Sequence, residues 1–339
     1  MLHRWTFALA FLSAGCASGN GGDSGFGNGE RGTEPATGGD AATSIGSPDT
    51  GQATTTGDSG APGTFGTTDG SATSNCASGA GAFIYVISDA NDLYTFDPTQ
   101  FPSAAAFTLV GSVGCDSSGV NSMAVDRSAT AWVNFNDGKI FKVTTTAPVT
   151  CTATSFVPGQ GGFTAVLGMG FSVDAAGAND ETLFVSDNGG PGGTCNRSTP
   201  GPGCTGLGLG TIDPTSMTLT ALGAYSGTAA GYNAELTGTG DGKLYGFFTT
   251  SPATYGLIDK TSGQTSTPPP TVLPTVNAST GGYAFSFWGG NFYFYTAPKN
   301  NTIVTQLNPT TGTTTASPEL GFTIVGAGVS TCAPTIGAQ

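Results

Sequence analysis

From about residue 76 onward, short apolar and aromatic runs alternate with clusters of Gly, Asp, Asn and Pro. The runs are five to seven residues long, and none continues with the 3.6-residue period of an amphipathic helix. Short runs bounded by turn residues are typical of β-strands. The pattern therefore predicts an all-β domain over residues 76–339, long enough for one large core or a ring of small ones.

One element recurs along this domain: an apolar strand that ends in a turn residue, most often Asp or Asn. The strands are Leu93–Phe96, Ile140–Val143, Leu209–Ile212, Tyr255–Ile258 and Val304–Leu307. The turn residues that follow, at 97, 144, 213, 259 and 308, are spaced by 47, 69, 46 and 49 residues. The long spacing contains the Gly/Pro-rich stretch 188–207, and without those 20 residues it is 49. The domain is therefore built of repeats.

Four of the repeats carry two further strands before this element, and a weaker strand follows each turn. The paired strands are Ser122–Asp126 with Ala131–Phe135, Met169–Val173 with Thr182–Asp187, Asn233–Thr237 with Lys243–Phe248, and Tyr283–Trp288 with Asn291–Thr296. Four strands in about 46 residues is the content of one β-propeller blade.

The first repeat lacks its innermost strand, whereas the C-terminus supplies a spare one at Thr323–Ser330. We expect this strand to pair with the N-terminal blade and close the ring, which removes exposed sheet edges. The sequence thus predicts a β-propeller of five four-stranded blades. A sixth, degenerate blade hidden in 144–213 is the alternative.

The N-terminus has a different pattern: a basic head, an apolar run over 5–12, and small residues before Cys16. This indicates a secretory signal peptide, because the run is shorter than the roughly 20 residues that span a bilayer. It resembles a bacterial lipoprotein signal, which implies that residues 1–15 are cleaved off and Cys16 is acylated. Ala17 after the cysteine implies the outer membrane, on either its periplasmic or its surface face. Because Ser13 replaces the usual Leu, an ordinary signal peptide is the alternative.

Residues 16–75 are mostly Gly, Ser, Thr, Ala and Asp, and Phe26 and Phe65 are the only aromatic residues among them. Such a composition cannot bury enough apolar surface to offset the entropy of ordering. We expect a disordered tether, and a flexible chain of this length has a reach of roughly 40–45 Å.

With Cys16 acylated, six cysteines remain, an even number that predicts disulfides in an oxidising compartment. Cys76 precedes the first blade and Cys332 ends the closing strand, so a bond between them would staple the ring. Cys195 and Cys204 bracket a Pro/Gly loop, and we expect them to pair.

Elimination leaves Cys115 and Cys151. In regular blades these residues would lie at opposite faces, about 15–20 Å apart at ~3.3 Å per residue, which is beyond disulfide reach. Either the strand ends are shifted or the two thiols are free. We retain the pair as a candidate.

Charge and composition exclude several classes of function. The chain has 9 Lys and Arg against 22 Asp and Glu without a basic cluster, so we expect no nucleic-acid partner. The single histidine, His3, lies in the signal peptide. The mature protein therefore lacks histidine bases, Ser-His-Asp triads and His-ligated zinc. We expect no cofactor, no resident metal and a monomer.

The stretches Met123–Asp126, Ala131–Val133 and Asp137–Phe141 resemble the blade pattern of the NHL, YVTN and gluconolactonase-like propellers. The resemblance covers residues 76–334 and implies a fold. It implies no activity, because lyases and lactonases with this fold use histidines or metal-binding carboxylates. This chain lacks the former and shows no match to the latter.

Propeller ligands usually meet the loops between blades. We take as candidate ligand-face residues the polar side chains of those loops and of the insertion: Asp116, Asn121, Gln160, Arg197, Tyr225, Tyr232 and Asn277. Polar loop residues without a ligand are the alternative. The aromatic run 283–295 indicates buried core strands, and a surface on which sugars stack is the alternative. Asp174 with 179–181 indicates a hairpin turn, and a Ca²⁺ site is the alternative; the stretch lacks the EF-hand pattern.

Three functions fit these observations. The first is a lipid-anchored cell-envelope propeller that binds a protein or a glycan without catalysis, and this interpretation is the one the sequence favours. The second is a metal-assisted hydrolase or lactonase of the gluconolactonase type. The third is a purely structural envelope protein. Whether the protein is an enzyme stays open at this point, with the absent histidine against it.

Overall fold

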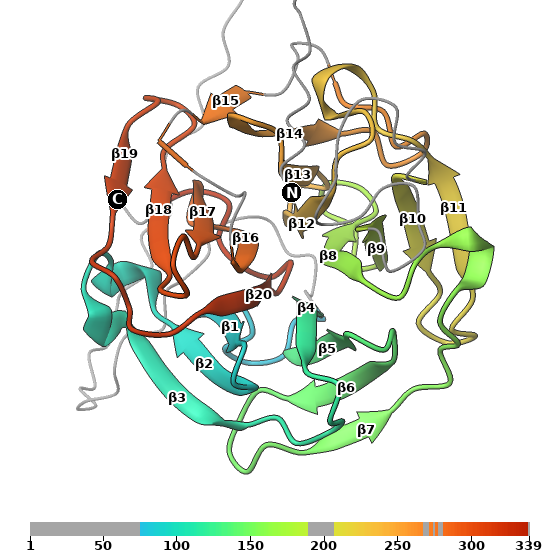
Figure 1. The fold of residues 1–339 in the computed structure, drawn as a ribbon, viewed down its shortest axis with the longest axis horizontal. Helices are drawn as coiled ribbons and strands as arrows, with labels where there is room; N and C mark the ends of the chain where they lie inside the picture. The colour runs from blue at the N-terminus through green and yellow to red at the C-terminus, as the bar shows by residue number, and fades with distance from the viewer. Residues whose placement is uncertain (1–74, 189–206, 267–270, 274, 277–280, 338–339) are drawn as a thin grey trace, which may run out of the picture. The chain divides into compact units, whose positions relative to one another are not determined.

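The computed structural model describes residues 75–337 except for 189–206, 267–270, 274 and 277–280. This part of the chain forms five sheets of four antiparallel strands, arranged as blades around a central axis (Figure 1). Its helices are four 3-10 turns of three residues: η1 (Pro98–Gln100), η2 (Ala104–Ala106), η3 (Gln160–Gly162) and η4 (Gly227–Ala229). The predicted five-bladed β-propeller is confirmed.

Each blade after the first follows the chain from the innermost strand to the rim. Blade two is β4 (Val120–Val125), β5 (Thr130–Phe135), β6 (Ile140–Thr144) and β7 (Cys151–Ala153). Blade three is β8 (Leu167–Val173), β9 (Glu181–Asp187), β10 (Leu209–Ile212) and β11 (Leu219–Gly223). Blade four is β12 (Ala234–Gly238), β13 (Leu244–Phe248), β14 (Ala253–Ile258) and β15 (Thr271–Leu273). Blade five is β16 (Tyr283–Trp288), β17 (Asn291–Thr296), β18 (Ile303–Leu307) and β19 (Thr314–Ala316).

Blade one is assembled from both ends of the domain. Its three outer strands are β1 (Ile84–Ser88), β2 (Asp92–Phe96) and β3 (Phe107–Ser112), and its innermost strand is the last of the chain, β20 (Ile324–Val329). β20 pairs antiparallel with β1, with Ile84 opposite Val329 (Figure 1). Ring closure by the C-terminal strand is thus confirmed.

The core lies between the blades. One cluster of buried hydrophobic side chains fills each of the five junctions. The inner strands are therefore covered on both faces, which explains their continuous apolar sequence. The aromatic run of blade five belongs to this core, as expected, since Tyr283, Phe285 and Phe294 are buried.

Glycines let the inner strands approach each other closely. A Cβ atom on Gly168 of β8 would lie 2.0 Å from the carbonyl oxygen of Ala234 on β12, and one on Gly238 would lie 2.0 Å from that of Phe171. Residues near the start of one strand thus meet residues near the start of the next, so these strands run in the same direction. We call the face where the inner strands begin the entry face, and the face where they end the exit face.

Side chains close the ring axis. Ser122 on β4 donates a hydrogen bond of 2.7 Å to Glu235 on β12, which joins blades two and four across the axis. Asn188 donates to the other carboxylate oxygen at 3.3 Å, and Glu235 is only 1% exposed. The space bounded by β4, β8, β12 and β20 leaves no room for a water molecule. This described stretch of the axis is packed protein and not a ligand channel.

Two disulfides staple the described part of the domain. Cys76 and Cys332 are bonded, with 6.0 Å between their Cα atoms, so the ring staple is confirmed. Cys195 and Cys204 lie outside the described residues.

Cys115 and Cys151 are also bonded, with 5.5 Å between their Cα atoms. The expected separation of about 15–20 Å is wrong, because it assumed outer strands that run along the ring axis. Neighbouring strands rotate by roughly 20–25°, so an outer strand is turned by about 60–75° from the inner strand of its blade. β3 and β7 therefore follow one another around the rim (Figure 1), which brings the loop after β3 to the start of β7.

The recurring turn residue has a structural role. Asp213, Asp259 and Asn308 each accept backbone N–H bonds from the residues two and three positions later, at 2.7 to 3.0 Å. Asp97 accepts the N–H of Thr99 at 3.0 Å in the same way. These bonds hold the turn that sends the chain to the outer strand, which accounts for the regular spacing in the sequence.

Candidate ligand groove

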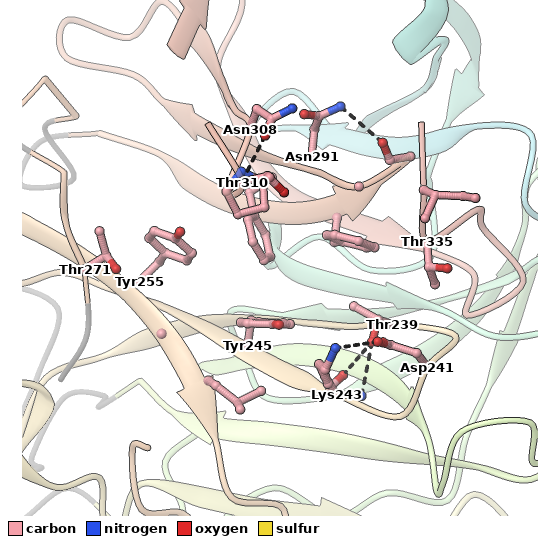
Figure 2. Close-up of a pocket in the computed structure, with 18 of the residues that line it drawn as sticks. Thr239, Asp241, Lys243, Tyr245, Tyr255, Thr271, Asn291, Asn308, Thr310 and Thr335 are labelled. Carbon is pink, nitrogen blue, oxygen red and sulfur yellow. Dashed lines mark hydrogen bonds and ion pairs between the residues drawn. The ribbon is translucent and has the colours of Figure 1, made fainter. Parts of the chain in front are cut away.

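A groove of about 590 Å³ opens between blades four and five on the exit face (Figure 2). Its walls come from the hairpin after β12, from β13 and β14, from the start of β17 and the turn after β18. The C-terminal residues 335–337 border it on another side. The volume falls within the range of about 300–1,000 Å³ that is typical of ligand sites.

Aromatic rings form one wall of the groove. Tyr245 on β13 and Tyr255 on β14 each pack against Phe292 of blade five, with ring centroids 4.8 and 5.0 Å apart. Phe287 completes the cluster at 5.1 Å from Phe292. Phe292 is 2% exposed and supports the two tyrosines, which both line the groove; Tyr245 is half-buried and Tyr255 is 9% exposed.

The tyrosine hydroxyls are neutral donors at physiological pH. Burial raises the pKa of Tyr245 above its ordinary value of 10.0, with Lys243 opposing this shift. Burial raises the pKa of Tyr255 as well, and a hydrogen bond with Thr271 opposes the shift. Both side chains therefore offer O–H groups to a ligand rather than phenolate charge.

Asp241 and Lys243 form the charged edge of the groove. Their ion pair spans 2.6 Å, and Thr239 also donates to Asp241. Partial burial opposes ionisation of Asp241, but the hydrogen bonds from Lys243 and Thr239 lower its pKa. The bond to Asp241 raises the pKa of Lys243. The two charges are thus both present near neutral pH and cancel locally.

Amide and hydroxyl groups stand opposite this edge (Figure 2). Asn308 Oδ1 accepts the N–H groups of Thr310 and Thr311, so the side chain is held in place as it caps its own turn. Its Nδ2 has no acceptor among the described residues. Asn291 donates to the carbonyl oxygen of Gly289 at 3.2 Å and keeps its own Oδ1 as an acceptor. The groove thus presents both donors and acceptors.

The described candidate residues chosen from sequence lie elsewhere, towards the entry face. Half-buried Asp116 is held by Lys139 at 2.8 Å, and hydrogen bonds from Lys139 and Ser118 lower the pKa of Asp116 to about 2. The side chain of Gln160 is hydrogen-bonded within blade three: its Nε2 donates to the carbonyl oxygen of Met217 at 3.0 Å, and its Oε1 accepts the N–H of Leu219 at 3.1 Å.

Two of the candidates, Asn121 and Tyr225, are buried side chains. Asn121 is 1% exposed and donates to Leu167 at 2.7 Å, which ties the starts of β4 and β8 together. Tyr225 is 4% exposed, packs edge-on against Phe248, and has its pKa raised by burial. Asn121 belongs to inner strand β4 and not to a loop, and Tyr225 packs into the core between blades three and four. Both positions depend on packing between blades, which the sequence does not show.

Tyr232 is half-buried and lines a second hollow of about 530 Å³ on the entry side of blade four. Arg197, Asn277 and Cys16 lie outside the described residues, so their assignments stay predictions. The structure thus brings none of the described sequence candidates into the larger groove.

The groove is not evident in the sequence because several segments, far apart along the chain, build it. In the sequence each segment resembles an ordinary strand or turn, and Asp241-Gly242 is a common hairpin dipeptide. Two tyrosines one strand apart, at 245 and 255, were the available sign of an aromatic wall.

The stretch weighed as a Ca²⁺ loop is a hairpin turn between β8 and β9. Glu181 accepts the N–H of Arg127 and the hydroxyl of Thr331, both at 2.7 Å, so hydrogen bonds occupy its carboxylate. In the described ranges, no three His, Cys, Asp or Glu side chains gather as a metal site would require. In the same ranges, no helix has the length and apolar character to cross a bilayer.

Comparisons with known proteins assign this chain to no family. No protein-family model and no curated protein matches the chain. Among solved structures, the Nidogen/Laminin complex matches with TM-score 0.45, 10% identity, and coverage of 73% of this chain and 97% of that one. A catalytically inactive virginiamycin B lyase from Staphylococcus aureus matches with TM-score 0.35 and 14% identity, and the match covers 69% of this chain and 68% of that one.

The Dos1 propeller gives TM-score 0.38, 12% identity and coverage of 66% of this chain and 52% of that one, so the match spans about half of its length. These TM-scores are all below 0.5 and the identities all below 25%. The similarity therefore carries no information about ligand or activity.

Proposed function

We propose that the protein is a lipid-anchored propeller of the cell envelope that binds a protein or a glycan and catalyses no reaction. The groove on the exit face is the observation that carries this proposal. It joins an aromatic wall to hydrogen-bonding groups from two blades, an arrangement that suits recognition.

The chemistry of the groove favours binding over catalysis. Asp241 is the carboxylate at its edge, and its lowered pKa and its bond to Lys243 make it a weak base. Efficient general bases instead have a pKa near the working pH. With no histidine after His3, the lining offers hydroxyls, amides and one neutralised ion pair.

Anchoring and location rest on the N-terminal sequence. We propose that acylated Cys16 holds a monomer at the outer membrane, with residues 16–75 as the tether. The intact mass of membrane-extracted protein tests this part directly. A diacyl or triacyl mass on Cys16 supports it, and an unmodified N-terminus overturns it.

Blocking the groove tests its role in binding. Thr310 is exposed at the turn after β18, so Thr310→Trp fills the groove without touching the core. Thr215 occupies the equivalent position in the Asp213-Pro214-Thr215 turn of blade three and is also exposed, which makes Thr215→Trp the matched control.

The assay measures binding of purified mature protein to a glycan array and to envelope proteins captured by crosslinking and then purified individually. We expect Thr310→Trp to weaken binding at least tenfold and Thr215→Trp to leave it unchanged. Absence of any binder, or equal effects of the two variants, contradicts the proposal. Substrate turnover that depends on one carboxylate also contradicts it.

A further inference from the structure

We infer that the groove between blades four and five takes a neutral oligosaccharide and discriminates against charged glycans and peptides. This inference rests on the proposed function and assigns the ligand class of the same site.

Local charge is the first argument. Among the described residues that line the groove, Asp241 and Lys243 are the only charged ones, and their 2.6 Å ion pair cancels their charges. The chain as a whole carries a formal charge of −13, so the surrounding potential repels anions. A charged glycan would lose its hydration in the groove without gaining an unpaired counter-charge. A neutral ligand meets no such cost.

The pattern of hydrogen-bonding groups is the second argument. Sugar hydroxyls both donate and accept, so a glycan site needs both kinds of partner at short intervals. The groove has hydroxyl donors on Tyr245 and Tyr255, an amide donor on Asn308, and an acceptor on Asn291. These groups come from separate strands and turns, and the Asn308 side chain is held in place by the turn it caps.

The aromatic wall is the third argument. A pyranose ring has faces of C–H groups that pack on aromatic rings, while its hydroxyls lie around the edge. Tyr245 is half-buried and offers ring surface and a polar tip at the same place, and Tyr255, 9% exposed, adds a smaller part of the wall. This combination suits such an amphipathic ligand. Contacts with Phe292 hold both rings, so little side-chain entropy is lost on binding.

The backbone around the groove argues against a peptide. Peptides that bind along a sheet add a strand to an unpaired edge. β13 and β17 reach the groove, yet each is already paired on both sides, with β12 and β14 and with β16 and β18. The edge strand β15 borders the groove through Thr271 alone, so it offers one lining residue and not a row of backbone groups. β13 and β17 leave no ladder for a peptide to extend, whereas side-chain hydroxyls and amides remain available for a glycan.

Isothermal titration calorimetry with defined oligosaccharides tests the inference. The neutral probes are maltohexaose and cellohexaose, and the charged probes are hexagalacturonate and the glucosamine hexamer. We expect at least one neutral hexamer to bind with a submillimolar Kd and both charged hexamers to bind at least tenfold more weakly. A charged hexamer that binds more tightly than both neutral ones overturns the inference.

Asp241→Asn unpairs Lys243 and should raise hexagalacturonate affinity severalfold. The chain supplies a matched control, because Asp137-Gly138-Lys139 repeats the same tripeptide on blade two with an ion pair that is also 2.6 Å long. Asp137→Asn changes the net charge equally but lies outside the groove, so it should leave every titration unchanged. Equal gains in the two variants would show a general charge effect and overturn the inference.

Tyr245→Phe removes one hydroxyl and keeps the ring. We expect it to weaken binding of the neutral hexamer by about 2- to 12-fold, which corresponds to the loss of one neutral hydrogen bond. Tyr94→Phe on β2 is the control, since Tyr94 is half-buried and stacks on Phe322 at 4.7 Å, away from the groove. Equal affinities of the two variants for the neutral hexamer overturn the role of the groove hydroxyl.

The outcomes separate the inference from the proposed function. If no hexamer binds but Thr310→Trp abolishes binding of an envelope protein, the neutral-glycan inference is overturned and the binding function stands. If Thr310→Trp changes the binding of no ligand, both are overturned. Near-UV circular dichroism of each variant shows that the fold is intact before titration.

Discussion

The Cys76–Cys332 bond should stabilise the domain more than the Cys115–Cys151 bond does. The first joins residues 256 positions apart and the second joins residues 36 apart. In the chain-entropy model, closing loops of these lengths removes about 5.5 and about 3.8 kcal/mol of denatured-state entropy. The ring staple should therefore contribute about 1.7 kcal/mol more.

Two double variants test this difference. The first, Cys76→Ser with Cys332→Ser, removes the ring staple, and the second, Cys115→Ser with Cys151→Ser, removes the other disulfide. Serine keeps a polar group near the Arg127 guanidinium, which lies 3.3 Å from the sulfur of Cys76. Urea unfolding followed by tryptophan fluorescence gives the free energy of unfolding of each variant and of the parent.

We expect the variant without the ring staple to lose more stability and to show the larger m-value, because its denatured state expands further. Equal losses, or a larger loss from the 36-residue loop, would refute the reasoning, since loop entropy would then not be the main contribution of the staple. Thermal unfolding of the same set provides a second reading if either variant unfolds without urea.

Three more predictions concern turns, inner strands and the axis. Hydrogen bonds from its turn hold the pKa of Asp259 at about 2, below the ordinary 3.8. The stabilisation by this carboxylate is therefore present above about pH 4 and is lost as the pH falls towards 2. Asp259→Asn should flatten the dependence of Tm on pH in that window. Gly168→Ala should destabilise by about 1–3 kcal/mol in urea titrations, whereas Gly114→Ala, which meets no atom within 4 Å, should change stability by less than about 0.5 kcal/mol. Ser122→Ala removes a donor to buried Glu235 and should cost about 1–3 kcal/mol by urea unfolding, and a neutral result would contradict the axial bond.

Blade number and ring closure could be predicted because the same Asp or Asn turn recurs in four of the five blades. Asp213, Asp259 and Asn308 mark the turn in three of these blades, and a local rule of this kind is visible without knowledge of distant contacts. The spare strand at 323–330 and the cysteines at 76 and 332 then fixed how the ring closes.

Features that depend on the twist of the sheets were not accessible from sequence. The rim position that joins Cys115 to Cys151 arises from rotation accumulated over three strand pairs. Burial of Asn121 depends on which neighbouring blade its side chain meets. The groove needs Tyr245, Asn291 and Asn308 to converge from segments with no shared motif, so only three-dimensional packing reveals it.

The shared first blade sets an order of events for the growing polypeptide. Ile84 waits for its partner Val329, which is added 245 residues later, so the free edge of β1 is open while four complete blades are made. An unpaired edge is a template for wrong pairing with other chains. Any translation product that stops before residue 324 lacks β20 and keeps the edge of β1 unpaired. Premature termination should therefore yield an open, aggregation-prone arc of blades rather than a slightly shorter propeller.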